Sequence, residues 1–181
     1  EKTQQRLDNL TKPRGSLGRL EELAKQIVGI TGKDNPSLSS KVIFTFAGDH
    51  GVTEEGVSAY PKEVTAQTVY NFVRGRAGIN VLARHVGARV VVADLGVGVD
   101  LEESPELIIK KINYGTQNMT KGPAMDRNEA IRSVEAGIEI FTGEYNKGID
   151  IIGTGEMGIG NTTPSSAITA VITGEDVKNV T

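Results

Sequence analysis

A carboxylate and an imidazole stand side by side, between glycines, in the segment Ala47–Gly51 (AGDHG). Asp49 and His50 can both take part in hydrogen bonds to a polar ligand, and an imidazole can also move a proton near neutral pH. The flanking Gly48 and Gly51 permit a tight turn and a close approach of a ligand to the backbone. The pattern favours a polar wall of a substrate cleft. The alternative is an Asp that caps a turn beside a locally bonded His.

A second chemical pattern is the glycine-rich segment Gly153–Pro164 (GTGEMGIGNTTP), predicted to be a loop between a buried strand and a helix. Unpaired N–H groups at the helix start would favour an anion such as a phosphate. Glu156, in mid-segment, would repel phosphate but could accept a hydrogen bond or proton from a substrate N–H. The segment is neither a P-loop nor a Rossmann fingerprint, so the alternative is an ordinary capped connection. Further side-chain oxygens come from Asn161, Thr162 and Thr163.

Two weaker patterns accompany these segments. Tyr60, within Gly56–Thr65, could line a pocket for a flat aromatic substrate, or it could pack beside Pro61. The two arginines of Val73–Gly78 (VRGRAG) suggest an anion contact or a tight loop, but a solvated basic loop is the simpler explanation.

The composition limits the classes of function. The chain has 181 residues, with 20 Lys and Arg against 23 Asp and Glu, and a formal net charge of −3. Without a clustered basic stripe, a duplex nucleic-acid surface is not expected. The absence of cysteine excludes thiolate metal sites, and His50 and His85 are too few for a histidine-rich metal cage. No apolar run approaches the ~18 residues of a membrane helix, so we expect a cytoplasmic protein that spans no membrane.

The elements that must position these residues follow from the apolar pattern. Residues 1–32 read as helical, 33–40 as a polar linker, and 41–181 as alternating strands and helices. Short continuous apolar strands between helices predict an α/β fold, with a doubly wound, mostly parallel sheet and helices on both faces. Ligands of such sheets bind at the carboxyl ends of the strands, where both chemical segments lie. Strands are predicted at 42–47, 89–94, 107–112 and 149–152, and helices at 61–73, 79–86, 126–145 and about 164–174.

Three stretches resemble a known family. Lys12–Ala24 (KPRGSLGRLEELA), Phe46–Thr65 (FAGDHGVTEEGVSAYPKEVT) and Gly153–Ala170 (GTGEMGIGNTTPSSAITA) resemble signature stretches of the nicotinate-nucleotide:dimethylbenzimidazole phosphoribosyltransferases, in the same order and with similar spacing. The resemblance covers nearly the whole chain. Family members are about twice this length, so the resemblance implies that the general-base glutamate and a phosphate-site lysine lie in a carboxyl-terminal half beyond these residues. No catalytic residue is therefore expected in this chain.

The resemblance also implies a fold, a reaction and partners. Residues 1–32 would be the helical part of a small domain, and 41–181 a parallel-sheet domain incomplete at its carboxyl end. The enzyme would be a homodimer that moves the phosphoribosyl group from nicotinate mononucleotide to 5,6-dimethylbenzimidazole or a similar base in cobalamin nucleotide-loop assembly. Its products would be nicotinate and α-ribazole 5'-phosphate. No cofactor and no metal are expected.

Matching by motif assigns substrate contacts to particular residues. Glu156 and Met157 would lie against the benzimidazole, and Tyr60 matches a position that is a base-contacting serine in some members. That departure leaves open another base or a phenol as acceptor. A non-catalytic nucleotide-binding module, or a fragment that only binds a partner copy, would also fit the segments. The expected substrate-binding residues are Asp49, His50, Tyr60, Glu156, Met157, Gly158, Gly160, Asn161, Thr162 and Thr163.

Overall fold

The computed structural model describes residues 1–181, which form two compact units, Glu1–Ser39 and Ser40–Thr181. The first unit holds two helices, α1 (Lys2–Asp8) and α2 (Arg19–Thr31). The segment between them is held by a shielded ion pair, in which Lys12 Nζ lies 2.7 Å from Glu21 Oε1. The hydrogen bond from Lys12 lowers the pKa of Glu21 below its ordinary value.

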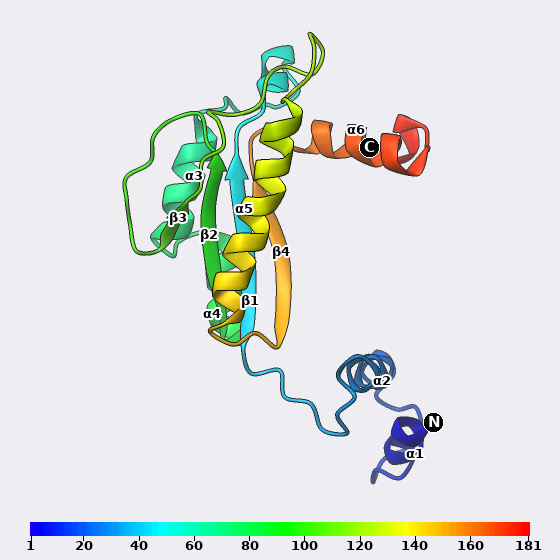
Figure 1. Ribbon diagram of the computed structural model, residues 1–181. Helices are drawn as coiled ribbons and strands as arrows, with labels where there is room; N and C mark the ends of the chain where they lie inside the picture. The colour runs from blue at the N-terminus through cyan, green and yellow to red at the C-terminus, as the bar shows by residue number, and fades with distance from the viewer. The chain divides into compact units, whose positions relative to one another are not determined.

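The second unit is built on a parallel sheet with the strand order β3-β2-β1-β4 (Figure 1). Its strands are β1 (Lys41–Gly48), β2 (Ala88–Gly96), β3 (Leu107–Ile109) and β4 (Ile151–Met157). Its helices are η1 (Gly51–Glu55), α3 (Val64–Val73), α4 (Gly78–Val86), α5 (Arg127–Tyr145), α6 (Thr162–Thr173) and η2 (Val177–Asn179).

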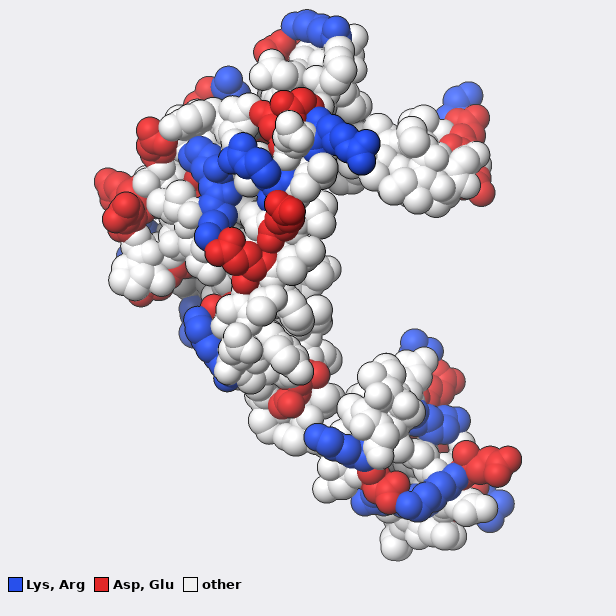
Figure 2. All heavy atoms as spheres, in the orientation of Figure 1, with Lys and Arg blue, Asp and Glu red and all other residues white.

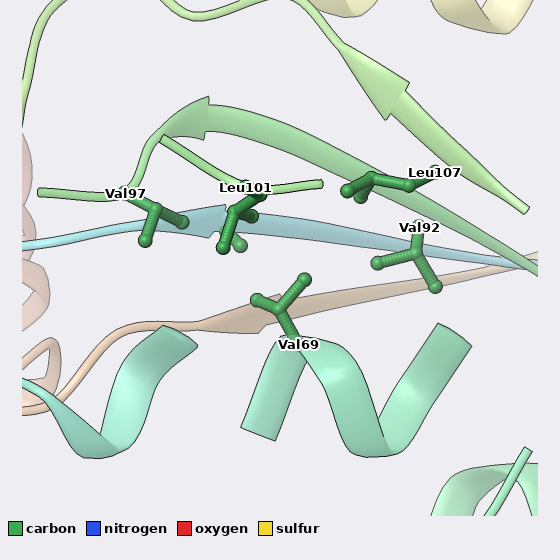
Figure 3. Close-up of a cluster of buried hydrophobic side chains, with 6 residues drawn as sticks. Val69, Val92, Val97, Leu101 and Leu107 are labelled. Atoms are coloured by element: carbon green, nitrogen blue, oxygen red, sulfur yellow. The ribbon is translucent and has the colours of Figure 1, made fainter. Parts of the chain in front are cut away.

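Helices cover both faces of this sheet, as the sequence predicts. On one face, Val69 of α3 is fully buried against Val92 and Leu107 (Figure 3). On the other face, Ile140 of α5 packs against Phe44. Successive side chains of a strand point to opposite faces, so a strand buried on both sides must be apolar almost throughout.

The predicted end of the fourth strand is wrong. β4 continues through the glycines to Met157, and Glu156 lies in the strand, paired with Phe46 of β1, rather than in a loop. The glycines serve close packing here: a Cβ on Gly155 would lie 3.2 Å from the carbonyl oxygen of Phe44. The expected burial is also wrong, because β4 is the edge strand of this sheet and Ile152 remains 48% exposed.

The amino-terminal end of α5 carries a capping box formed by Asp126 and Glu129. Asp126 Oδ1 accepts a hydrogen bond from the Glu129 backbone N–H at 2.8 Å, and Glu129 Oε2 accepts one from the Asp126 N–H at 2.9 Å. Two N–H groups that the helix leaves unpaired are thereby satisfied.

Removal of this cap should weaken the domain measurably. We expect Asp126→Ala to lower the free energy of unfolding by about 1 kcal/mol, the usual cost of losing an N-cap acceptor. Urea denaturation measures the change. Asp126→Asn keeps an acceptor oxygen and should cost much less, so equal losses in the two variants would contradict the capping role.

None of the helices combines the length and the apolar character that crossing a membrane requires. Figure 2 shows acidic and basic side chains interspersed over the visible face of the second unit, beside uncharged areas.

Candidate functional site

A small cavity of about 140 Å³ opens where β1 and β2 end. Its walls come from the two strand ends, from the segment that follows β3, and from the first turns of α5. The amino-acid pattern predicts this location, because parallel strands present their carboxyl ends at one edge. The lining residues are Gly48, Asp49, His50, Leu95, Gly96, Ile112, Asn113, Gly115, Thr116, Met125, Glu129 and Ser133.

Asp49 is held by the neighbouring strand end. Its backbone N–H donates to the Gly96 carbonyl at 2.8 Å, and its carboxylate Oδ2 accepts from the Gly98 N–H at 2.7 Å. Its own carbonyl accepts from the Thr116 N–H at 3.0 Å. The other carboxylate oxygen, Oδ1, is buried without a partner. Asp49 therefore fixes the position of the cavity wall and of the residue that follows it.

The imidazole of His50 lies next to Gly158, in the turn that follows β4. A Cβ on Gly158 would lie 2.8 Å from His50 Nε2 and 2.2 Å from the Gly48 carbonyl oxygen, so only glycine fits this contact. Burial lowers the pKa of His50 below its ordinary value, although the neighbouring Asp49 carboxylate opposes the shift. The imidazole is therefore held in its neutral form near neutral pH, when it can both accept and donate a hydrogen bond.

The lowered pKa of His50 makes stability depend on pH. The folded state takes up a proton less readily than the unfolded chain, whose histidine titrates near pH ~6.5. The stabilisation is therefore present above about pH 6.5 and is lost as the pH falls towards the lowered value. We expect urea midpoints to fall between about pH 7 and about pH 5.5, before most carboxyl groups titrate. An equally steep fall in His50→Gln would contradict this origin.

The turn Gly158–Asn161 is tied to the start of α3. The Ile159 N–H donates to Thr65 Oγ1 at 3.1 Å, and Thr65 is completely buried. Gly160 has a φ of 77°, in the left-handed region that favours glycine. Two segments far apart in the sequence are thus joined at one edge of the sheet, and α6 begins directly after the turn with Thr162.

The remaining predicted residues lie around this turn, with one exception. Glu156 is exposed, and its carboxylate accepts a hydrogen bond from the Asn161 side chain. Met157 points to the opposite face, where it packs against the α3 core. Thr162 and the half-buried Thr163 open α6. Tyr60 stands apart from the cavity: its side chain is 66% exposed in a shallow hollow beside Pro61 and Lys62.

Several residues of the site carry no signal in the linear pattern. Thr65 gives none, because a single Thr at a helix start is usual. Glu129 caps the start of α5, and its Oε1 also accepts a hydrogen bond from the Asn113 side chain at 2.6 Å in the cavity wall. The segment after β3 could have been suspected, because it follows a strand at the functional edge.

A family model described as phosphoribosyltransferase matches residues 1–181. The chain belongs to the nicotinate-nucleotide:dimethylbenzimidazole phosphoribosyltransferase family. Among curated relatives, the protein of that name from Geotalea uraniireducens (strain Rf4) is 61% identical over 180 residues, which is 99% of this chain and 51% of the relative. The protein of the same name from Geobacter sulfurreducens is 60% identical over 178 residues, 98% of this chain and 51% of the relative.

A solved structure agrees with this family membership. The crystal structure of CobT from Thermus thermophilus superposes with a TM-score of 0.94 at 43% identity, covering 98% of this chain and 54% of that one. The chain thus spans about half the length of the family members that it matches.

Proposed function

We propose that the protein transfers a 5-phosphoribosyl group from nicotinate mononucleotide to 5,6-dimethylbenzimidazole or a similar base. The products are nicotinate and α-ribazole 5'-phosphate, the nucleotide of cobalamin. The observation that carries the proposal is the contact of Gly158 with Gly48 and His50, because it brings both chemical segments to one edge of the sheet. The homodimer implied by the family resemblance belongs to the same proposal, and light scattering tests it.

The two sides of the turn would do different work. Pro164 in the first turn of α6 has no N–H, and the Thr163 N–H donates to the Gly160 carbonyl at 3.2 Å. The N–H groups of Gly160 and Thr162 are therefore the ones left at this helix start for the phosphate of the nucleotide. Glu156 lies at the end of β4 and offers carboxylate oxygens to an N–H of the incoming base. Gly160 and Thr163 would border the nucleotide, and the neutral His50 supplies a polar wall. The general base is assigned to none of these 181 residues.

Turnover with and without the acceptor base tests the proposal. The intact protein is incubated with nicotinate mononucleotide, and nicotinate release is followed by chromatography. We expect release only when 5,6-dimethylbenzimidazole is present, together with stoichiometric α-ribazole 5'-phosphate. Equal release without any base would contradict the transferase. Nucleotide binding without any product would instead support a non-catalytic nucleotide-binding module, and a faster reaction with a phenol would reassign the acceptor.

A neutral substitution at Glu156 should separate the two ligands. We expect Glu156→Gln to weaken binding of the base about tenfold, because one good hydrogen bond to a charged acceptor contributes ~1.5 kcal/mol or more. Binding of the nucleotide should change less, since its phosphate faces N–H groups. Calorimetric titration with each ligand measures both constants. A larger loss for the nucleotide would contradict the assigned role.

A further inference from the structure

A buried ion pair lies behind the cavity and outside the residues assigned to substrate. Lys111 Nζ lies 2.8 Å from Asp94 Oδ2, and the two side chains are 13% and 0% exposed. A charged pair is costly to bury unless its remaining hydrogen-bonding capacity is satisfied, and here it is used on backbone. The other oxygen, Asp94 Oδ1, accepts from the N–H groups of Gly96 at 3.0 Å and Val97 at 2.8 Å.

The ammonium group has further partners on the same loop. Lys111 Nζ donates to the carbonyl of Val97, and to that of Val99 at 3.0 Å. The Tyr114 ring covers it, with the centroid 4.9 Å away. The Lys111 ammonium group therefore binds both the Asp94 carboxylate at the end of β2 and two backbone carbonyls of the loop that follows β2.

That loop is the one that holds Asp49. The Gly96 carbonyl accepts the Asp49 N–H at 2.8 Å, and the Gly98 N–H donates to the Asp49 carboxylate at 2.7 Å. Gly96 and Gly98 thus bind Asp49, while Asp94 and Lys111 bind the backbone of Gly96, Val97 and Val99 in the same loop. A shift of the loop would move Asp49, and with it the adjacent His50.

We propose that Lys111 is a positioning residue, which holds the loop Gly96–Val99 by its backbone carbonyls and so fixes Asp49 and His50 in the cavity wall. Its ammonium does more than neutralise Asp94. The inference rests on the proposed function only in taking this cavity as part of the substrate site. The position of His50 can be measured without turnover, so a failure of the positioning role and a failure of the transferase are distinguishable.

The variants separate the two roles of Lys111. Lys111→Met alone leaves the Asp94 carboxylate buried and unpaired, which threatens folding. The double variant Asp94→Asn/Lys111→Met removes both charges, and the amide oxygen of the introduced asparagine can still accept from the N–H groups of Gly96 and Val97. Apart from the ion pair itself, this variant loses the hydrogen bonds to the Val97 and Val99 carbonyls and the contact of the ammonium group with the Tyr114 ring. Lys110→Met is the matched control, because the half-buried Lys110 is the neighbouring lysine and its ammonium group pairs with Glu139, at 2.6 Å, rather than with the loop.

These 181 residues hold two histidines, His50 and His85. In imidazole NMR spectra of the intact protein, the signal that disappears in His50→Gln identifies His50. In the folded double variant, we expect the pKa of His50 to move up towards its ordinary value. We also expect kcat/KM for phosphoribosyl transfer to fall about 10- to 100-fold, the effect of a small misplacement. An unchanged His50 titration would overturn the proposal, as would the same change in Lys110→Met. If His50 moves and no protein form transfers phosphoribosyl, the positioning role stands and the transferase fails.

Discussion

Replacing Gly158 by alanine is expected to reduce kcat/KM for the proposed phosphoribosyl transfer about 100-fold, the loss that a displacement of about 1 Å produces in an active site. The added Cβ would lie 2.2 Å from the Gly48 carbonyl oxygen and 2.8–2.9 Å from the His50 ring. One of these neighbours is backbone in the central strand, which cannot move cheaply. The turn, and with it the start of α6, must therefore retreat from β1. Steady-state kinetics with both substrates measures the loss.

The preceding strand supplies a matched control for this substitution. A Cβ on Gly153 would meet only the Ile43 side chain, at 3.4 Å, so Gly153→Ala requires a small adjustment of a flexible group. We expect Gly153→Ala to retain most of the activity. Similar losses in Gly153→Ala and Gly158→Ala would show that this part of the chain tolerates no added side chain anywhere, and would contradict a specific role for the contact with His50.

The fold could be predicted from the sequence because strands that are buried on both faces consist almost entirely of apolar residues. The apolar run around Phe44 and the valines of β2 are covered on both faces, and the structure confirms the parallel sheet with helices on both sides. The carboxyl end of β4 could not be predicted from the sequence, because the glycines that form it are also typical of loops. Only the register with β1 shows that Gly155 and Glu156 belong to the strand.

The sequence predicts the edge of the sheet at which both chemical segments lie, but not the contacts between them. The two strand-end segments were correctly expected to lie at one edge, because that follows from parallel pairing. Asp49 and Gly98 are 49 residues apart, and no local pattern indicates their hydrogen bond. The aromatic character of Tyr60 suggests a pocket, but its side chain is exposed outside this cavity, beside Pro61, so its contact with the base stays a prediction.

Gly51→Ala should lower the free energy of unfolding by about 1–3 kcal/mol, the usual range for forcing an extra methyl group into a packed region. A Cβ there would lie 2.5 Å from the backbone nitrogen of Asn118 and 2.7 Å from the Thr116 carbonyl oxygen. Side-chain hydrogen bonds lock this contact, because Asn118 is buried and its Nδ2 donates to Glu55 Oε1 at 2.6 Å. Urea denaturation measures the loss.

Gly122, in the segment between β3 and α5, serves as a control that separates a steric clash from a general effect of replacing glycine. Gly122 has open space where a Cβ would stand, so Gly122→Ala should leave the urea midpoint close to that of the wild type. Because Thr116 lines the cavity and its N–H binds the Asp49 carbonyl, Gly51→Ala should also raise the KM for substrate. If Gly51→Ala has the stability of the wild type, the backbone at residues 116–118 can move to make room for the methyl group. That result would contradict a rigid cavity wall.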